Sequence, residues 1–170
     1  EELMTDLKEG VKLLYIGDNA GEIVFDKLLI EELSAETGCD VVFAVRGGIA
    51  MNDALMEDAE MVGLPDVARV ITTGSDYLGV SMADCSSEFS EAVEGAGVII
   101  AKGHANFETM CDIHDNIYHL LTIKCKCVAE EMGLEEGASV LWHRRPRGSC
   151  ELASLDNQSL KTFFAHCESR

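Results

Sequence analysis

Apolar residues along this chain alternate between short continuous runs and longer segments in which they recur at helical spacing. The continuous runs are typical of buried parallel strands, and the longer segments are typical of amphipathic helices. The predicted strands cover residues 11–17, 40–46, 67–74, 97–103, 117–125 and 138–143. The predicted helices cover residues 21–37, 52–63 and 86–96, with a further short helix that ends at Gly133. This alternation predicts a three-layer α/β/α Rossmann-like domain with a mostly parallel sheet.

Polar residues and glycines mark the ends of the predicted helices. Gly38 is expected to close the first helix, because glycine readily adopts the left-handed conformation at a helix C-terminus. Asn52 or Asp53 is expected near the N-cap of the second helix, and a serine is expected to cap the third. These signals divide the chain into successive strand and helix units without a linker.

The chain divides into a core and a tail by composition. Residues 1–143 are predicted to form one Rossmann-like catalytic domain, since they carry the whole strand and helix alternation. Residues 144–170 begin with a basic stretch and continue with polar residues, which predicts a C-terminal extension outside the catalytic core. Residues 159–167 of this tail have the pattern of one amphipathic helix.

Polar, small or charged residues follow four of the predicted strands at their carboxyl ends. These stretches are residues 17–19, 46–48, 72–76 and 102–108. The carboxyl ends of parallel strands meet at one edge of the sheet, and ligands of open α/β sheets bind at that edge. The sequence therefore predicts an active site formed by these four loops.

The side chains in these loops suit a metal ion and a phosphate. Asp18, Asn19 and Asp53 offer oxygen ligands to a hard cation. Lys102 could supply a positive charge to a phosphate oxygen, and Arg46 could bind one in bidentate fashion. Each also has a structural interpretation, because the two aspartates could cap helices and the lysine could be an ordinary surface residue. Only their coincidence at successive strand ends favours a site.

Charge and motif content exclude several classes of function. The net charge of -18 argues against nucleic acid or an anionic membrane as a partner. A phosphorylated metabolite needs only a local positive site, which a bound cation can provide. The sequence lacks a P-loop, a nucleophile elbow of the GxSxG type and a GxGxxG dinucleotide fingerprint.

Two further features concern the compartment. The sequence contains no run of 18 apolar residues, so it does not predict a membrane span. The seven cysteines are odd in number and form no CxxC pair, which indicates free thiols in a reducing compartment. We therefore expect a cytoplasmic protein.

Four segments of the chain resemble a known family. They are GDNAGE at 17–22, RGGIAMNDALMEDA at 46–59, TTGSDYLG at 72–79 and KGHANFETM at 102–110. In this order they resemble the metal-dependent damage-control phosphatases, also called domain of unknown function 89, and most closely the small archaeal and bacterial branch. The resemblance covers about residues 11–143. It implies a Rossmann-like domain that uses Mg²⁺, Mn²⁺, Co²⁺ or Ni²⁺ to hydrolyse phosphate monoesters of small metabolites, such as sugar phosphates or phosphopantetheine-like compounds.

The resemblance also implies roles for individual residues. The implied metal ligands are Asp18, Asn19 and Asp53, and the implied phosphate-binding residues are Lys102 and, in the same loop, Asn106. Glu22, Arg46, Ser75 and Asp76 occupy motif positions near the substrate pocket. The residues expected to act in the chemistry itself are Asp18, Asp53 and Lys102.

The mechanism expected from these roles is in-line attack of water on phosphorus, with Asp18 or Asp53 accepting the proton. A covalent aspartyl-phosphate at Asp18 is a less favoured route.

Two other functions stay open. One is a metal-dependent carboxyl methyltransferase, and the other is a non-catalytic domain that binds metal and phosphate. The non-catalytic alternative is considered because only about ten residues precede Val11, so the family's N-terminal helical segment is expected to be largely absent.

Overall fold

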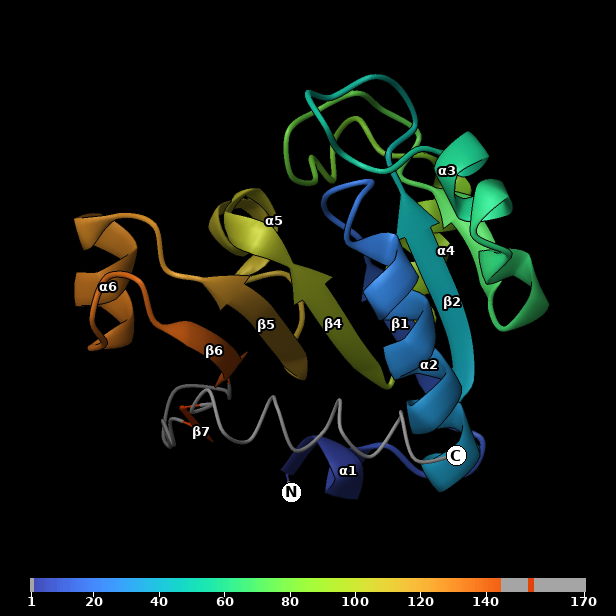
Figure 1. The fold of residues 1–170 in the computed structure, drawn as a ribbon, viewed down its shortest axis with the longest axis horizontal. Helices are drawn as coiled ribbons and strands as arrows, with labels where there is room; N and C mark the ends of the chain where they lie inside the picture. The colour runs from blue at the N-terminus through green and yellow to red at the C-terminus, as the bar shows by residue number, and fades with distance from the viewer. Residues whose placement is uncertain (1, 145–152, 155–170) are drawn as a thin grey trace.

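A mostly parallel sheet forms the centre of the fold (Figure 1). The computed structural model describes residues 2–144 and 153–154. Within them the sheet has seven strands in the order β3-β2-β1-β4-β5-β6-β7. Strands β1 to β5 are parallel to one another, β6 is antiparallel to β5, and β7 is antiparallel to β6. The strands are β1 Lys12–Ile16, β2 Asp40–Val45, β3 Arg69–Thr72, β4 Val98–Lys102, β5 Ile117–Thr122, β6 Ser139–Arg144 and β7 Ala153–Ser154. The predicted α/β class is confirmed.

Helices cover both faces of the sheet. Helix α2 (Ile23–Thr37) packs on one face and α4 (Ser87–Gly95) on the other, as Figure 1 shows. Successive side chains of β1 point to opposite faces, so Tyr15 packs in the core cluster that includes α2 and Ile16 packs in the cluster that includes α4. The other helices are α1 Glu2–Asp6, α3 Met56–Met61, α5 Gly103–Met110, α6 Lys126–Met132 and the 3-10 helix η1 Leu64–Asp66.

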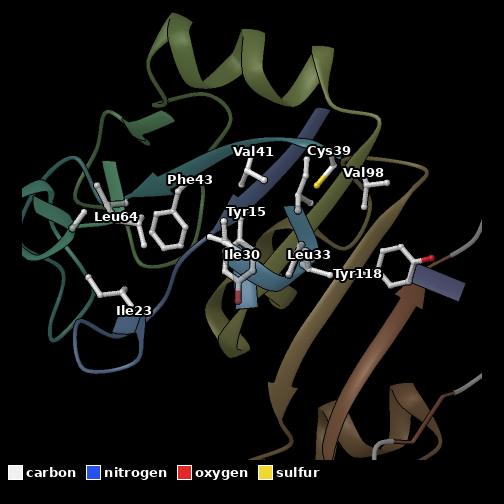
Figure 2. Packing of buried hydrophobic residues seen from close by; sticks show 14 of the residues in the cluster. Tyr15, Ile23, Ile30, Leu33, Cys39, Val41, Phe43, Leu64, Val98 and Tyr118 are labelled. Atoms are coloured by element: carbon white, nitrogen blue, oxygen red, sulfur yellow. The ribbon is translucent and has the colours of Figure 1, made fainter. Parts of the chain in front are cut away.

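The apolar core beneath α2 positions the loops of the site (Figure 2). The rings of Tyr15 in β1 and Phe43 in β2 are fully buried and stack with centroids 5.3 Å apart. Full burial of an apolar side chain stabilises a fold by about 1.5–3 kcal/mol. The cluster therefore fixes β1 and β2 relative to α2, and with them the loops that carry Asp18 and Arg46.

Several predicted helix ends are confirmed. Gly38 ends α2 in the left-handed conformation with φ of 69°, and its N–H bonds to the carbonyl of Ser34. Ser86 caps α4, since its Oγ accepts a hydrogen bond of 3.1 Å from the N–H of Phe89. Gly133 ends α6. Local side-chain chemistry is enough to define these ends.

The start of the second predicted helix is wrong by four residues. The prediction places Asn52 or Asp53 near the N-cap, whereas α3 begins at Met56. Leu55 occupies the N-cap position, and its N–H bonds to Asp58 Oδ2 at 2.9 Å. Asp53 is instead held by an antiparallel bridge to Asn19, which removes it from the helix.

Three elements differ from the predictions or were not predicted. The prediction extends the fourth strand to Gly103 and treats the residues that follow it, to 108, as a loop, but α5 begins at Gly103, directly after β4. Gly103 has a positive φ of 80°, which permits a helix to follow the strand without an intervening loop. Strand β5 ends at Thr122, three residues before the predicted end at residue 125. Helix α1 has no counterpart among the predicted elements.

The sheet continues beyond residue 143. Strand β6 ends at Arg144, and β7, which lies in the predicted C-terminal extension, pairs with β6. The amphipathic helix predicted at residues 159–167 lies outside the described residues.

Across residues 2–144, none of the helices is both long enough and apolar enough to span a bilayer. Five cysteines in the described part of the chain are free thiols: Cys39, Cys85, Cys111, Cys125 and Cys127.

Candidate active site

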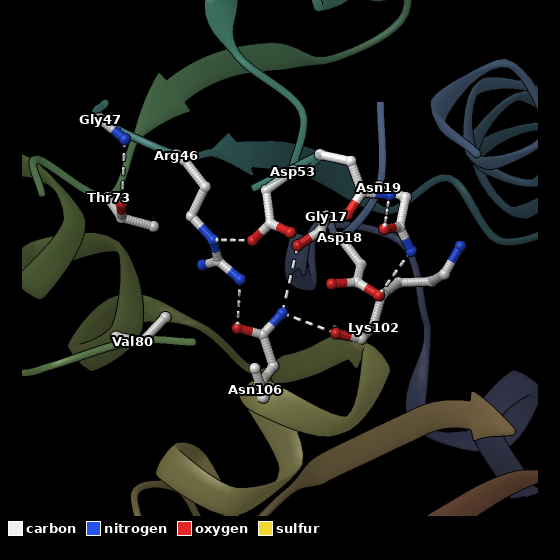
Figure 3. Close-up of polar contacts among 12 residues, drawn as sticks. Gly17, Asp18, Asn19, Arg46, Gly47, Asp53, Thr73, Val80, Lys102 and Asn106 are labelled. Carbon is white, nitrogen blue, oxygen red and sulfur yellow. Dashed lines mark hydrogen bonds and ion pairs between the residues drawn. The ribbon is translucent and has the colours of Figure 1, made fainter. Parts of the chain in front are cut away.

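The carboxyl ends of β1, β2 and β4 bring most of the predicted site residues together (Figure 3). Asp18 and Asn19 follow β1, and Lys102 is the last residue of β4. The loop after β2 folds back onto the loop after β1, because the Ala54 N–H donates to the Asp18 carbonyl at 2.8 Å and the Ala20 N–H to the Asn52 carbonyl at 2.9 Å. These backbone bonds place Asp53 beside Asp18.

Asp18 and Asp53 form an acidic pair. Burial raises the pKa of Asp18, and the negative charges of Asp53 and Glu22 raise it further, to about 6. The positive charges of Arg46 and Lys102 oppose this rise without cancelling it. Carboxylates that repel each other in a half-buried place are stabilised by a cation between them. The pair therefore concentrates negative charge that a bound cation would offset.

The third predicted ligand, Asn19, points its amide nitrogen toward Asp18, whereas a metal ligand would have to point its oxygen there. Its Nδ2 donates to Asp18 Oδ2 at 2.9 Å and to Glu22 Oε1 at 2.8 Å, while its Oδ1 accepts from Asn52 Nδ2. Within residues 2–144, no three His, Cys, Asp or Glu side chains gather closely enough to hold a metal by themselves. A half-turn of the Asn19 amide would exchange its nitrogen and oxygen, and the donor set would then suit a hard cation.

Arg46 and Asn106 lie beneath the acidic pair rather than in the cleft. The Arg46 side chain is only 1% exposed, its Nε donates to Asp53 Oδ2 at 2.6 Å, and its Nη2 donates to Asn106 Oδ1 at 2.9 Å. Asn106 is also fully buried and donates to the carbonyl oxygens of Gly17 at 3.1 Å and Lys102 at 2.7 Å. In this structure both residues hold the strand ends and Asp53 in place.

Lys102 is largely buried between two carboxylates. Its Nζ lies 2.7 Å from Asp26 Oδ1 and 2.8 Å from Glu22 Oε2. Burial lowers the pKa of Lys102, but the two carboxylates raise it by more, so its pKa lies above the ordinary value. Burial acts to raise the pKa of Glu22, but the contact with Lys102 outweighs it and lowers that pKa. Lys102 is therefore positively charged at neutral pH.

Sequence reasoning missed Asp26. Its carboxylate is buried and accepts hydrogen bonds from Lys102 and from the Tyr15 hydroxyl, both at 2.7 Å. The sequence did hold a signal, because Glu22 and Asp26 are four residues apart and share one face of α2.

Ser75 and Asp76 are not brought to the cleft. The Ser75 carbonyl accepts a hydrogen bond of 2.9 Å from the Gly47 N–H, and Asp76 packs close to Gly48. This loop after β3 supports the loop after β2. The expectation that Ser75 and Asp76 bind substrate is not reflected in their contacts here.

A cleft of about 260 Å³ opens beside the acidic pair. Its lining residues are Asp18, Glu22, Lys102, Gly103, His104, Leu120, Leu121, Thr122, Lys124 and Ser139. The hydroxyls of Thr122 and Ser139 lie 3.0 Å apart. His104 Nε2 accepts from the Lys124 N–H at 2.9 Å, which ties α5 to the loop before α6. Sequence reasoning missed the Thr122, Lys124 and Ser139 side because it did not predict that β6 pairs with β5.

The fold and this cleft define an α/β/α domain with an acidic pair and a charged lysine at the carboxyl edge of its sheet. Residues 1–140 match the family model described as the damage-control phosphatase ARMT1-like domain. The chain therefore belongs to the damage-control phosphatase family, as the sequence motifs indicate.

Archaeal relatives support this membership. The chain is 44% identical over 149 residues to the uncharacterized protein MJ0202 of Methanocaldococcus jannaschii, covering 84% of this chain and 49% of the relative. It is 43% identical over 141 residues to damage-control phosphatase PH1575 of Pyrococcus horikoshii, covering 82% and 49%. A damage-control phosphatase of Archaeoglobus fulgidus is 38% identical over 142 residues, covering 82% and 48%. The chain spans about half the length of these curated relatives.

A solved structure shares the fold. The crystal structure of a DUF89 family protein from Pyrococcus horikoshii superposes with a TM-score of 0.80 at 41% sequence identity. The match covers 85% of this chain and 51% of that chain. The architecture described above is therefore shared with about half of that family member.

Proposed function

We propose that this chain carries the catalytic site of a divalent-metal-dependent phosphatase that hydrolyses phosphate monoesters of small metabolites. One observation carries the proposal: the acidic pair of Asp18 and Asp53 shares an edge of the sheet with the buried, positively charged Lys102, and Asp18 and Lys102 line the same cleft. Family membership supports the same activity, because two of the relatives are named damage-control phosphatases.

The residues that would hold the metal are Asp18, Asp53 and, after rotation of its amide, Asn19. Their oxygens suit Mg²⁺, Mn²⁺, Co²⁺ or Ni²⁺, with water and phosphate completing the shell. When bound, such an ion would offset the repulsion of the two carboxylates and polarise a phosphate oxygen. Arg46 supports this role, because its bond to Asp53 fixes the direction of that carboxylate.

The chain's own groups provide the other parts of the chemistry. Lys102 would donate a hydrogen bond to a phosphate oxygen and offset charge that builds up in the transition state. Asp18 is the better proton acceptor of the acidic pair, because it lines the cleft and Arg46 already binds Asp53. Asp18 would then accept the proton of a water that attacks phosphorus in line with the leaving group.

The cleft favours a compact, hydroxylated substrate. With the phosphate near Lys102, the leaving group would lie against Thr122, Lys124 and Ser139. The cleft of about 260 Å³ is smaller than the pockets that hold drug-sized ligands, about 300–1,000 Å³, and its described lining has no Phe, Tyr or Trp on which a large ring could stack. Of the two implied substrate classes, sugar phosphates fit this lining better than phosphopantetheine-like compounds.

Phosphate release from a panel of sugar phosphates tests the proposal. The wild-type chain should turn over with Mn²⁺ or Ni²⁺ and stop when the metal is chelated, and Asp18→Ala should be inactive. Asp40→Asn is the matched control, since Asp40 is an exposed carboxylate at the amino end of β2. Activity of Asp18→Ala with unchanged metal dependence would refute the site. Stabilisation by metal and phosphate without turnover would indicate a non-catalytic binding domain instead.

A further inference from the structure

The two carboxylates that hold Lys102 differ in their surroundings. The Asp26 side chain is 3% exposed and does not line the cleft, whereas the Glu22 side chain is 44% exposed and does. A phosphate oxygen could replace Glu22 at small cost, because water can solvate the displaced carboxylate. It could not replace Asp26, because a buried carboxylate without its cation is strongly destabilising.

Tyr15 fixes the carboxylate of Asp26. The tyrosine is fully buried near the carboxyl end of β1, and its hydroxyl donates to the same Asp26 Oδ1 that contacts Lys102. The other oxygen, Asp26 Oδ2, is buried with no hydrogen-bond partner among the described residues. The orientation of this carboxylate thus depends on two contacts, one from Tyr15 and one from Lys102.

We propose that Tyr15 and Asp26 are positioning residues that hold the ammonium of Lys102 at the floor of the cleft, while Glu22 is the exchangeable partner that a substrate phosphate replaces. This inference rests on the proposed phosphatase function. A lysine side chain has several rotatable bonds and loses rotamer entropy when it is fixed. Because the Tyr15–Asp26 pair fixes Lys102 before substrate arrives, no reorganisation is needed as charge develops on the phosphoryl group.

Tyr15→Phe tests the anchor, with Tyr118→Phe as its matched control. Tyr118 is also a buried strand tyrosine whose hydroxyl donates to a carboxylate, that of Asp6, at 2.6 Å, and it does not line the cleft. Tyr15→Phe should lower kcat by about 10-fold and leave KM within about 2-fold, since the charge remains but its alignment is lost. Tyr118→Phe should lower thermal stability to a similar degree without changing kcat.

A second readout does not depend on turnover. The acetylation rate of Lys102 by a small reagent, followed by mass spectrometry with exposed Lys8 as internal reference, should rise in Tyr15→Phe and stay at the wild-type rate in Tyr118→Phe. Equal kcat values and equal Lys102 acetylation rates in the two variants would overturn the inference. If the wild type releases no phosphate, the proposed function fails, and the acetylation rates alone decide whether Tyr15 and Asp26 anchor Lys102.

Discussion

Asp18→Asn should abolish phosphatase activity and, at the same time, stabilise the metal-free fold. The substitution keeps the shape of the side chain but removes one charge of the acidic pair. The pKa of Asp18 rises from 3.8 to about 6 on folding. A rise of this size corresponds to about 3 kcal/mol if fully expressed, and solvent screening of the half-buried carboxylate reduces it to about 1–2 kcal/mol.

The sign of this effect depends on pH. Above pH 6, Asp18 is ionised in the folded protein, where burial disfavours its charge and Asp53 and Glu22 repel it, so the folded state is destabilised relative to the unfolded chain. This penalty shrinks as the pH falls below 6 and disappears below 3.8, where the carboxyl group is protonated in both states. The gain from Asp18→Asn should therefore be full at pH 8 and much smaller at pH 4.5.

Urea unfolding in the presence of EDTA measures this gain. The free energy of unfolding of Asp18→Asn should exceed that of the wild type by about 1–2 kcal/mol at pH 8. Asp40→Asn, at the opposite edge of the sheet, should not reproduce the increase. A variant that is less stable than the wild type at pH 8, or a gain that is the same at pH 8 and pH 4.5, would refute this electrostatic reasoning.

The other expectations concern the framework, the substrate side and pH. Arg46→Met should cost about 3–5 kcal/mol in urea unfolding, because it leaves the buried carboxylate of Asp53 unpaired; an unchanged stability would contradict this role. The double variant Thr122→Ala/Ser139→Ala should raise KM for sugar phosphates several-fold but leave p-nitrophenyl phosphate hydrolysis unchanged; equal loss for both substrates would contradict the subsite. The affinity of the wild type for Mn²⁺ should weaken as the pH drops below 6, because protonated Asp18 does not bind metal, and an affinity that stays constant between pH 5 and 8 would contradict this.

The sheet and the loops at its carboxyl edge could be predicted because their signals are local. Continuous apolar runs such as residues 40–46 indicate buried strands, and parallel strands place their carboxyl ends together. Gly38 and Ser86 end or cap helices through contacts with residues only a few positions away. This was sufficient to place Asp18, Asn19 and Lys102 at one site.

The failures share a physical cause, which is contact between residues far apart in the sequence. Asp53 has the local pattern of a helix cap, but it forms a bridge to Asn19 and lies before the start of α3. Arg46 has the chemistry of a phosphate ligand, but Asn106, 60 residues away, helps to bury it beneath the acidic pair. Asp26 looks like an ordinary polar position of an amphipathic helix until Lys102 packs against it. Local patterns can place two residues on one face of a helix, but they do not identify the distant residue that packs against them.

The proposed metal site is tested most directly by anomalous diffraction from crystals of the chain grown with Mn²⁺ and inorganic phosphate. We expect one strong anomalous peak bounded by the carboxylates of Asp18 and Asp53, with the amide oxygen of Asn19 turned toward it and the phosphate in contact with Lys102. The absence of a peak between these residues, with the Asn19 nitrogen still bonded to Asp18 as it is here, would contradict the account.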